Sequence, residues 1–232
     1  MMRFISCILL MLLTVPFLHA QQSAPNVTDS LGRKQGHWRQ LNEGMQPVYQ
    51  GYFVDDVPVG EMIHFFPNGR TRAVLYYEKH SDTVSARIFH ANGRLKSEGS
   101  YLNQNRTGEW RFYSSAGNLA AIEHYVDDFK HGLSQNFLSS GVVIEEATYE
   151  MGKRHGFLRQ YFQHGKLRSV KQYQADVLHG NAVFYHSNGA ISGKGQYVNG
   201  LRDGEWIWFA PEGDTLSIQQ WTAGTLPEVE TE

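Results

Sequence analysis

Three histidines recur at one spacing that suggests metal binding. His131, His155 and His179 follow one another at intervals of 24 residues. If they occupy equivalent places in neighbouring hairpins, two strands separate each from the next, so they lie about 9 to 10 Å apart. Zinc requires each ligand nitrogen within about 2.1 Å of the ion. We therefore interpret the histidines as turn residues that bond locally or face solvent, and we expect no metal and no other cofactor.

Tryptophan side chains are the second candidates for chemistry. Exposed Trp and Tyr rings anchor protein interfaces, and exposed aromatic rows also bind sugars. The alternative is cross-strand packing, which a single-layer sheet needs on at least one face. The candidate binding residues among the tryptophans are Trp110, Trp206 and Trp208. The last two come first among them, because we expect the final repeat to form an exposed end.

Basic residues form a further column beside the histidines. They are Arg106, Lys130, Arg154 and Arg202, and the aspartates close to them are Asp128, Asp176 and Asp203. A basic edge would suit phosphates or lipid headgroups, but these aspartates cancel most of its field. We therefore favour a solvated turn edge. The whole chain has 21 Lys and Arg against 23 Asp and Glu, a balance that argues against a nucleic-acid partner.

Catalytic sets have no recognisable spacing in this chain. His186 and Ser187 are neighbours at a predicted hairpin tip, and Glu145 and Glu146 point to opposite faces of a predicted strand. Neither pair converges on one point, as a catalytic site requires. We expect that the protein is not an enzyme.

The elements that carry all these residues repeat every 24 residues. One glycine recurs at this period, with Val84 in its place in the third unit: Gly36, Gly60, Gly108, Gly132, Gly156, Gly180 and Gly204. An aromatic residue lies 17 positions after each of these points: Phe53, Tyr77, Tyr101, Tyr125, Tyr149, Tyr173, Tyr197 and Trp221. Such self-similarity indicates stacked supersecondary units. The units are residues 34–57, 58–81, 82–105, 106–129, 130–153, 154–177, 178–201 and 202–225.

Each unit has the pattern of one β-hairpin. Residues 109–113 are rich in aromatic residues, and a second strand-like run, 119–125, follows a turn that contains Gly117. Several units have Asn-Gly at this turn, which is the strongest short-range hairpin signal. No segment has a helical period. We therefore expect an all-β fold, an elongated single-layer twisted antiparallel sheet of eight tandem hairpins.

The hairpin register explains the joint recurrence of glycine and aromatic residue. A turn about seven to ten positions after the repeating glycine places the aromatic residue directly opposite it. We expect the ring to cover the bare glycine backbone, as aromatic residues do in other sheets.

The two ends of the chain fall outside the repeats. Arg3, the apolar run 4–13 and the segment 18–20 have the pattern of a secretory signal peptide over residues 1–20. We expect a linker over 21–33 and a disordered acidic tail over 226–232. The apolar run is too short for a transmembrane helix, and we expect none elsewhere. These features predict a protein that is secreted, or located in the periplasm or cell envelope.

The repeats resemble those of the MORN-repeat variant family. The resemblance rests on segments such as Gly108-Glu109-Trp110-Arg111-Phe112-Tyr113, Asn92-Gly93-Arg94-Leu95 and Tyr197-Val198-Asn199-Gly200. The third repeat departs most from the pattern, with Val84 and Ala86 where glycine and a large residue usually stand. In the first repeat Gly44 comes one place early, and we expect these two units to pair less regularly. The resemblance implies interaction modules, some of them antitoxin components and others linked to membranes, and it implies no catalytic residues.

These observations favour a non-enzymatic protein-interaction platform. Many equivalent shallow positions suit an extended contact with another protein, whereas a catalytic pocket needs different residues at one point. A cell-wall or glycan-binding module, working through exposed aromatic rings, is the alternative. Peripheral membrane association through the basic turns, or an antitoxin-like role, is a further one.

Overall fold

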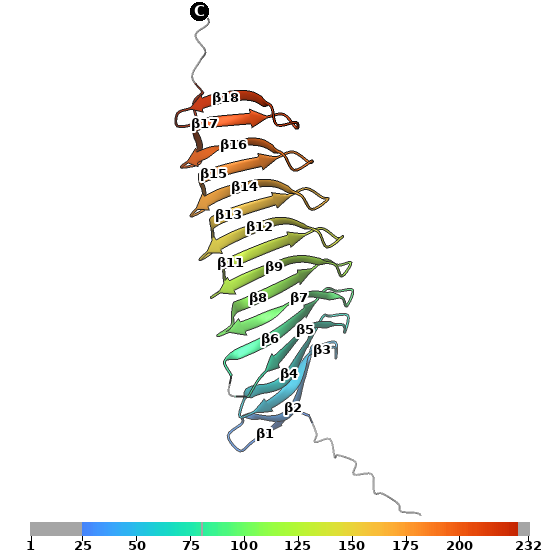
Figure 1. Cartoon of the computed structure of the whole chain (residues 1–232). Helices are drawn as coiled ribbons and strands as arrows, with labels where there is room; N and C mark the ends of the chain where they lie inside the picture. Colours follow the sequence, from blue (N-terminus) through green and yellow to red (C-terminus); the bar gives the residue numbers. More distant parts are fainter. Residues whose placement is uncertain (1–24, 80, 227–232) are drawn as a thin grey trace, which may run out of the picture.

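The chain forms one open antiparallel sheet. The computed structural model describes residues 25–79 and 81–226. Within these ranges it has 18 strands, and no helix is long and apolar enough to cross a bilayer. Figure 1 shows the strands stacked in chain order as a single layer, from β1 and β2 (blue) to β17 and β18 (red). The expected all-β architecture of tandem hairpins is confirmed.

The strands follow the 24-residue period. They are β1 (Val27–Thr28), β2 (Lys34–Leu41), β3 (Pro47–Val54), β4 (Val57–Phe65), β5 (Thr71–Tyr77), β6 (Thr83–Phe89), β7 (Leu95–Leu102), β8 (Asn105–Tyr113), β9 (Leu119–Val126), β10 (Phe129–Lys130), β11 (Gly132–Phe137), β12 (Val143–Glu150), β13 (Lys153–Tyr161), β14 (Leu167–Gln174), β15 (Val177–Tyr185), β16 (Ile191–Val198), β17 (Leu201–Phe209) and β18 (Thr215–Trp221). Strand β1 precedes the first repeat, and β10 and β11 together form the first strand of the fifth. Every repeat is therefore one hairpin.

The repeating glycines lie opposite the aromatic residues, as the register predicts. The pairs are Gly36 and Phe53, Gly60 and Tyr77, Gly108 and Tyr125, Gly132 and Tyr149, Gly156 and Tyr173, Gly180 and Tyr197, and Gly204 and Trp221. In the third repeat Val84 faces Tyr101. The hairpins therefore share one register.

Backbone conformation, and not ring coverage, explains these glycines. Their φ angles are positive, +67° at Gly108 and +106° at Gly180, in the region that glycine enters without steric cost. A Cβ atom at Gly108 would meet no atom within 4 Å, and at Gly180 its nearest neighbour would be the side chain of Gln172. The expected cover by the opposite ring is therefore absent at both positions.

The left-handed glycines accompany bulges between successive hairpins. The register of β14 and β15 shifts between Lys171 and Tyr173, and most other pairs that join two repeats shift there or one residue earlier. Strand β6 has Val84 instead of glycine, and its ladder with β5 runs without a shift. We expected the first and third repeats to pair less regularly, and this is wrong: the first hairpin has the common register, and the third joins its predecessor more regularly.

Two-residue turns connect the hairpins along one edge of the sheet. Asp127 and Asp128, between β9 and β10, both have positive φ, as a type I′ turn requires. The backbone N–H of Asp128 donates to the Arg106 carbonyl at 3.1 Å, and the Asp128 carboxylate accepts the Arg106 N–H at 3.0 Å. Asp176 bonds to Arg154 in the same way two turns later in the stack. Each turn is thus tied to the preceding turn of the edge.

The core is built from large side chains that lie on glycines of the neighbouring strand. Trp110 and Trp206 are 1% and 0% exposed. A Cβ atom at Gly99 would come within 2.6 Å of the Trp110 ring, and one at Gly195 within 2.7 Å of the Trp206 ring. The bare backbone therefore lets each indole lie flat on the sheet. We call this side of the sheet, which also carries Phe112, the aromatic face.

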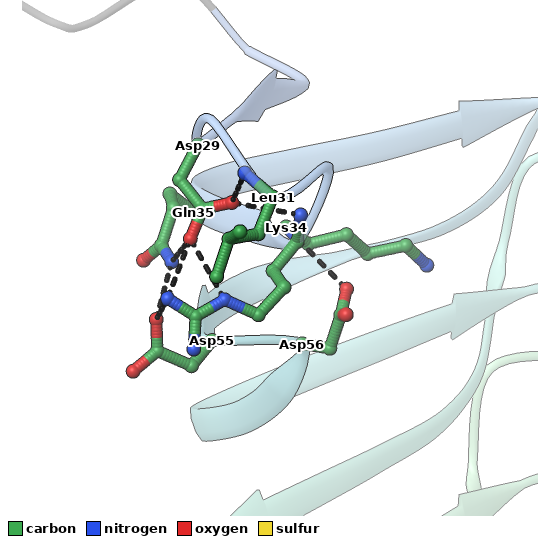
Figure 2. A network of polar contacts seen from close by, with 7 residues as sticks. Asp29, Leu31, Lys34, Gln35, Asp55 and Asp56 are labelled. Carbon is green, nitrogen blue, oxygen red and sulfur yellow. Dashed lines mark hydrogen bonds and ion pairs between the residues drawn. The ribbon is translucent and has the colours of Figure 1, made fainter.

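Residues 25–33 form an ordered cap, whereas we expected part of a linker there. Strand β1 pairs with β2, and the Asn26 amide exchanges two hydrogen bonds with the Arg39 backbone, 2.7 and 3.0 Å long. Figure 2 shows the Asp29 carboxylate beside the turn that follows, where it accepts bonds from Leu31, Arg33 and Gln35. Burial alone would raise the pKa of Asp29, but these bonds lower it to about 2. The predicted signal peptide lies outside the described residues, as does the acidic tail except Leu226.

Candidate functional site

The tryptophans chosen as candidate binding residues belong to the core. Trp110 and Trp206 present almost no surface to a ligand. Trp208 is half-buried, lies against Gly193, and donates from Nε1 to Gln219 at 3.3 Å. The last repeat does not expose these rings, because they lie flat on the preceding strand. Packing explains them, and the geometry does not support the binding role.

The three histidines are exposed and make local contacts, but two of them lie in strands, His155 in β13 and His179 in β15, and His131 lies between β10 and β11. His155 Nδ1 lies 3.5 Å from the Glu150 carboxylate, and His179 Nδ1 accepts the Asn199 N–H at 3.4 Å. In the described part of the chain, no group of three or more His, Cys, Asp or Glu residues is arranged to hold a metal. The exposure and the local contacts agree with our interpretation, but the placement in turns was wrong for His155 and His179, which lie in strands.

The basic column covers the aromatic face. Arg106 Cζ lies 4.0 Å from the Tyr125 ring centroid, and Arg154 Cζ lies 4.6 Å from that of Tyr173. Arg202 lies 4.7 Å from the Trp206 ring. A cation over an aromatic face is attracted by the ring quadrupole. Sequence reasoning treated this column as a solvated turn edge and missed these contacts. The basic residues complete the core, and they do not form a free positive surface.

The second and third repeats lack this cover. The covering cations are the first residues of their units, and at this position the second and third units have Pro58 and Asp82; the seventh unit, with Leu178, also has no cation there. The third unit also has Ala86, 3% exposed, where the fourth has Trp110. The seventh unit shares two of these features, with Leu178 and Ala182, so the second and third repeats differ from the others in that two units without the cation are adjacent.

A hollow of about 510 Å³ lies on the aromatic face at this place. Its lining comes from β4 to β7 and the turn after β7: His64, Arg72, Ala73, Leu75, Tyr77, Val84, Ile88, Tyr101 and Gln104. The Tyr101 side of the hollow is held in place, because the Tyr101 ring packs edge to face against the Trp110 indole, with the ring centroids 5.0 Å apart. We call it the third-repeat hollow. It is the candidate functional site.

The sixth and seventh repeats show what fills the equivalent space. Lys171 stands at the position of Leu75, and its Nζ lies 5.6 Å from the Phe184 ring. Arg154 stands at the position of Pro58 and covers Tyr173, the counterpart of Tyr77. In these repeats long cationic side chains therefore cover the counterparts of Tyr77 and Ile88, whereas no cation among the described residues lies over Tyr197, the counterpart of Tyr101. In the second and third repeats short or uncharged residues replace them.

The ring side chains that line the hollow are uncharged at pH 7. Burial, and then the charge of Arg72, lower the pKa of His64. Burial raises the pKa of Tyr77, and burial is also the main cause of the raised pKa of Tyr101. Arg72 is the one charged side chain of the lining. In the sixth repeat, burial and then the charge of Arg168, the counterpart of Arg72, lower the pKa of Lys171, so the fold places a second cation beside this position.

A second hollow, of about 360 Å³, lies on the opposite face of the same repeats. Its charged lining residues are Glu61, Arg87, Glu98, Glu109 and Arg111. Arg111 pairs with Glu109 at 2.6 Å. This hollow has mixed charge and fewer rings, so the third-repeat hollow is the better binding candidate.

Sequence reasoning noted part of the signal for the hollow. The departures at Val84 and Ala86 were visible on the 24-residue grid. The absence of a cation at Pro58 and Asp82 was also visible on this grid. Its importance became clear only from the structure, in which the equivalent cations cover aromatic rings. The contribution of Leu75 required the register between β5 and β6.

Comparison with known proteins is consistent with the repeat pattern. Residues 84–103, 106–127 and 178–199 match the family model described as MORN repeat variant. The first of these segments contains most of the third repeat, and the others fall in the fourth and seventh. No curated protein matches the chain.

Proposed function

Because the chain carries repeats of the MORN variant, we propose that it is a non-enzymatic platform that binds another protein. Repeats of this kind generally serve in binding and not in catalysis. The observation that carries the proposal is the third-repeat hollow, where the neighbouring rings of Tyr77 and Tyr101 both lack the cation that covers the equivalent ring in five of the other six repeats. The partner inserts a Lys or Arg side chain there.

Two features of the hollow support a cationic occupant with a long apolar stem. Leu75, Ile88 and the rings offer apolar contact to a methylene chain, as Lys and Arg stems prefer. The exposed Asp82 has replaced a base at the start of the third repeat, which removes a positive charge that would repel the occupant.

The other functions considered have less support. The glycan alternative rested on exposed tryptophans, and Trp110 and Trp206 are buried. The membrane alternative rested on free basic turns, and Arg106 and Arg154 cover rings and contact aspartates. Export to the cell envelope or secretion is part of the proposal and rests on the pattern of residues 1–20. N-terminal sequencing of the mature protein tests it, and a chain that retains Met1 refutes it.

One substitution tests the hollow directly. In Pro58→Arg the chain supplies its own cation, as Arg154 does in the sixth repeat. N-acetyl-arginine amide at millimolar concentration should shift the ring NMR signals of Tyr77 and Tyr101 in the wild-type protein but not in Pro58→Arg. The uncharged N-acetyl-norvaline amide should shift neither. Val57→Arg adds the same charge one residue earlier, at a side chain 60% exposed, and should bind like the wild type.

The same variants test the partner. Crosslinking in intact cell envelopes should recover one protein with the wild type and with Val57→Arg, and lose it with Pro58→Arg. If no specific protein is recovered with the wild type, the interaction proposal fails. If Pro58→Arg retains the partner, the third-repeat hollow is not the contact.

A further inference from the structure

The two end strands of the sheet differ in whether their outer edges are paired. At the first end the outer edge of β2 is paired with β1 and with the side chain of Asn26. At the other end, β18 pairs with β17, and no strand among the described residues pairs with its outer edge. A free edge presents unpaired N–H and C=O groups that can accept another strand.

Strand β18 lacks two of the usual protections of an edge, although its ladder with β17 has a bulge at Leu216, near the start of the strand. It contains no charged residue and no proline. Leu216 and Ile218 alternate with more buried residues and are 68% and 61% exposed on the face opposite the indoles. Ile218 continues a cross-strand apolar contact with Ile207 of β17. The edge therefore offers both a backbone ladder and an apolar row.

Charge determines which strand can occupy this edge. From Asp203 to Glu232 the chain has seven acidic residues and no Lys, Arg or His. Among the described ones, Glu205, Glu212 and Asp214 are exposed, and none forms an ion pair with another described residue. A second copy of this chain would bring an identical acidic end against the first, which is unfavourable.

We infer that β18 is a docking edge for an extended basic segment of a partner protein, which adds to the sheet as a further strand. Glu205 lies across from Gln220 near one end of β18, and Asp214 precedes the other end. Six residues separate positions 214 and 220, about 20 Å of extended chain. The segment thus carries Lys or Arg about six residues apart, with β-branched residues between them on the face of Leu216 and Ile218.

A designed peptide tests the edge without knowledge of the partner. The probe is acetyl-Lys-Thr-Val-Thr-Val-Thr-Lys-amide, which places two lysines and two valines on one face. It should bind the full chain, slow amide hydrogen exchange along β18, and bind more weakly as salt increases. The same peptide with glutamate for lysine should bind at least tenfold more weakly. A version with proline for the central threonine, which cannot complete the ladder, should also lose tenfold or more.

Variants of the chain locate the binding site. Ile218→Lys places a charge on the apolar row and should weaken peptide binding at least tenfold. Val57→Lys, at a side chain with equal exposure in β4, is the matched control and should leave binding unchanged. Glu205→Lys should weaken binding of the lysine peptide and restore binding of the glutamate peptide. If Ile218→Lys does not fold, the glutamate and proline peptides tested on the wild type still show whether binding depends on charge and on the backbone ladder.

Several results would overturn the inference. They are no binding of the lysine peptide at millimolar concentration, equal binding of the two charge versions, or protection of strands other than β18. A wild-type dimer that forms through β18 and excludes the peptide would assign the edge to a second copy. Loss of binding in Pro58→Arg with β18 intact would place the peptide in the third-repeat hollow instead, which separates this inference from the proposed function.

Discussion

The contact between Gly99 and Trp110 allows the most direct test of our account of how the core of this single-layer sheet is packed. Gly99→Ala adds one methyl group, and its carbon would come within 2.6 Å of the indole. That approach is far inside van der Waals contact, so the ring or the strand must move. Trp110 is 1% exposed and packs with Tyr125, so it has little room. Overpacking of this kind costs about 1–3 kcal/mol.

A second substitution should recover much of that loss. The fifth and sixth repeats have Ala147 and Leu158 at the positions of Gly99 and Trp110, and both are buried. Trp110→Leu alone leaves a cavity over Gly99 and should cost somewhat less than the about 3–5 kcal/mol typical of Trp→Ala. The double variant reproduces a pair that this fold already contains. We therefore expect it to be at least about 1 kcal/mol more stable than the sum of the single changes predicts.

The assay is a double-mutant cycle measured by urea denaturation. Circular dichroism at equilibrium gives the free energy of unfolding for the wild type, both single variants and the double variant. Hydrogen exchange of β7 and β8 shows whether the loss is local. If the single effects add within about 0.5 kcal/mol, then the ring does not need the bare glycine, and our account of the core is wrong.

Four further predictions follow from the contacts. Gly108→Ala should cost about 1–2 kcal/mol in thermal denaturation although its Cβ would meet no atom within 4 Å, because φ is +67°; a neutral result contradicts this. Burial and Arg72 lower the pKa of folded His64, so the unfolded state binds its proton more readily and stability should fall as pH drops below about 6.5; His64→Phe should flatten that slope in stability measurements between pH 7 and 5. Arg202→Leu should cost about 1–2 kcal/mol in urea denaturation, since its guanidinium covers three indole rings, and Arg202→Lys should cost less. Folded Asp29 has a pKa of about 2, below the 3.8 of the free group, so its contribution to stability is present above pH 3.8 and is lost towards pH 2. Hydrogen exchange should show β1 opening over that pH range, and it should show the same opening at neutral pH in Asp29→Asn.

The hairpins and their register could be read from the sequence because their determinants are local. Each turn requires glycine or a small polar residue at a fixed place, and the turn sets the pairing of the strands on either side. The role of glycines such as Gly108 was harder to assign. A positive φ and an uncovered backbone both favour glycine, and sequence alone does not separate them.

The core and the hollow depend on contacts between repeats, which explains why they were harder to predict. Trp206 is buried because Gly195, in the preceding hairpin, leaves room for it. The hollow is lined by Leu75 and Val84 and has no covering cation at Pro58, and these residues are each ordinary in a strand and act together only after stacking. The N-terminal cap was also missed. It is held by side-chain bonds to the backbone, which leave no periodic pattern in the sequence.

The ties between successive turns give the sheet a mechanical character. From β2 onward each strand pairs with its neighbours in sequence, with β10 and β11 counted as one strand, and Figure 1 shows the first and last repeats at opposite ends of the stack. Tension applied through the two ends therefore loads the hairpins in series, and they should peel away one after another from whichever end yields first. Each released unit adds 24 residues, about 80 Å of extended chain. A force-extension record should show a row of evenly spaced steps, so the protein would behave as an extensible tether and lengthen in fixed increments.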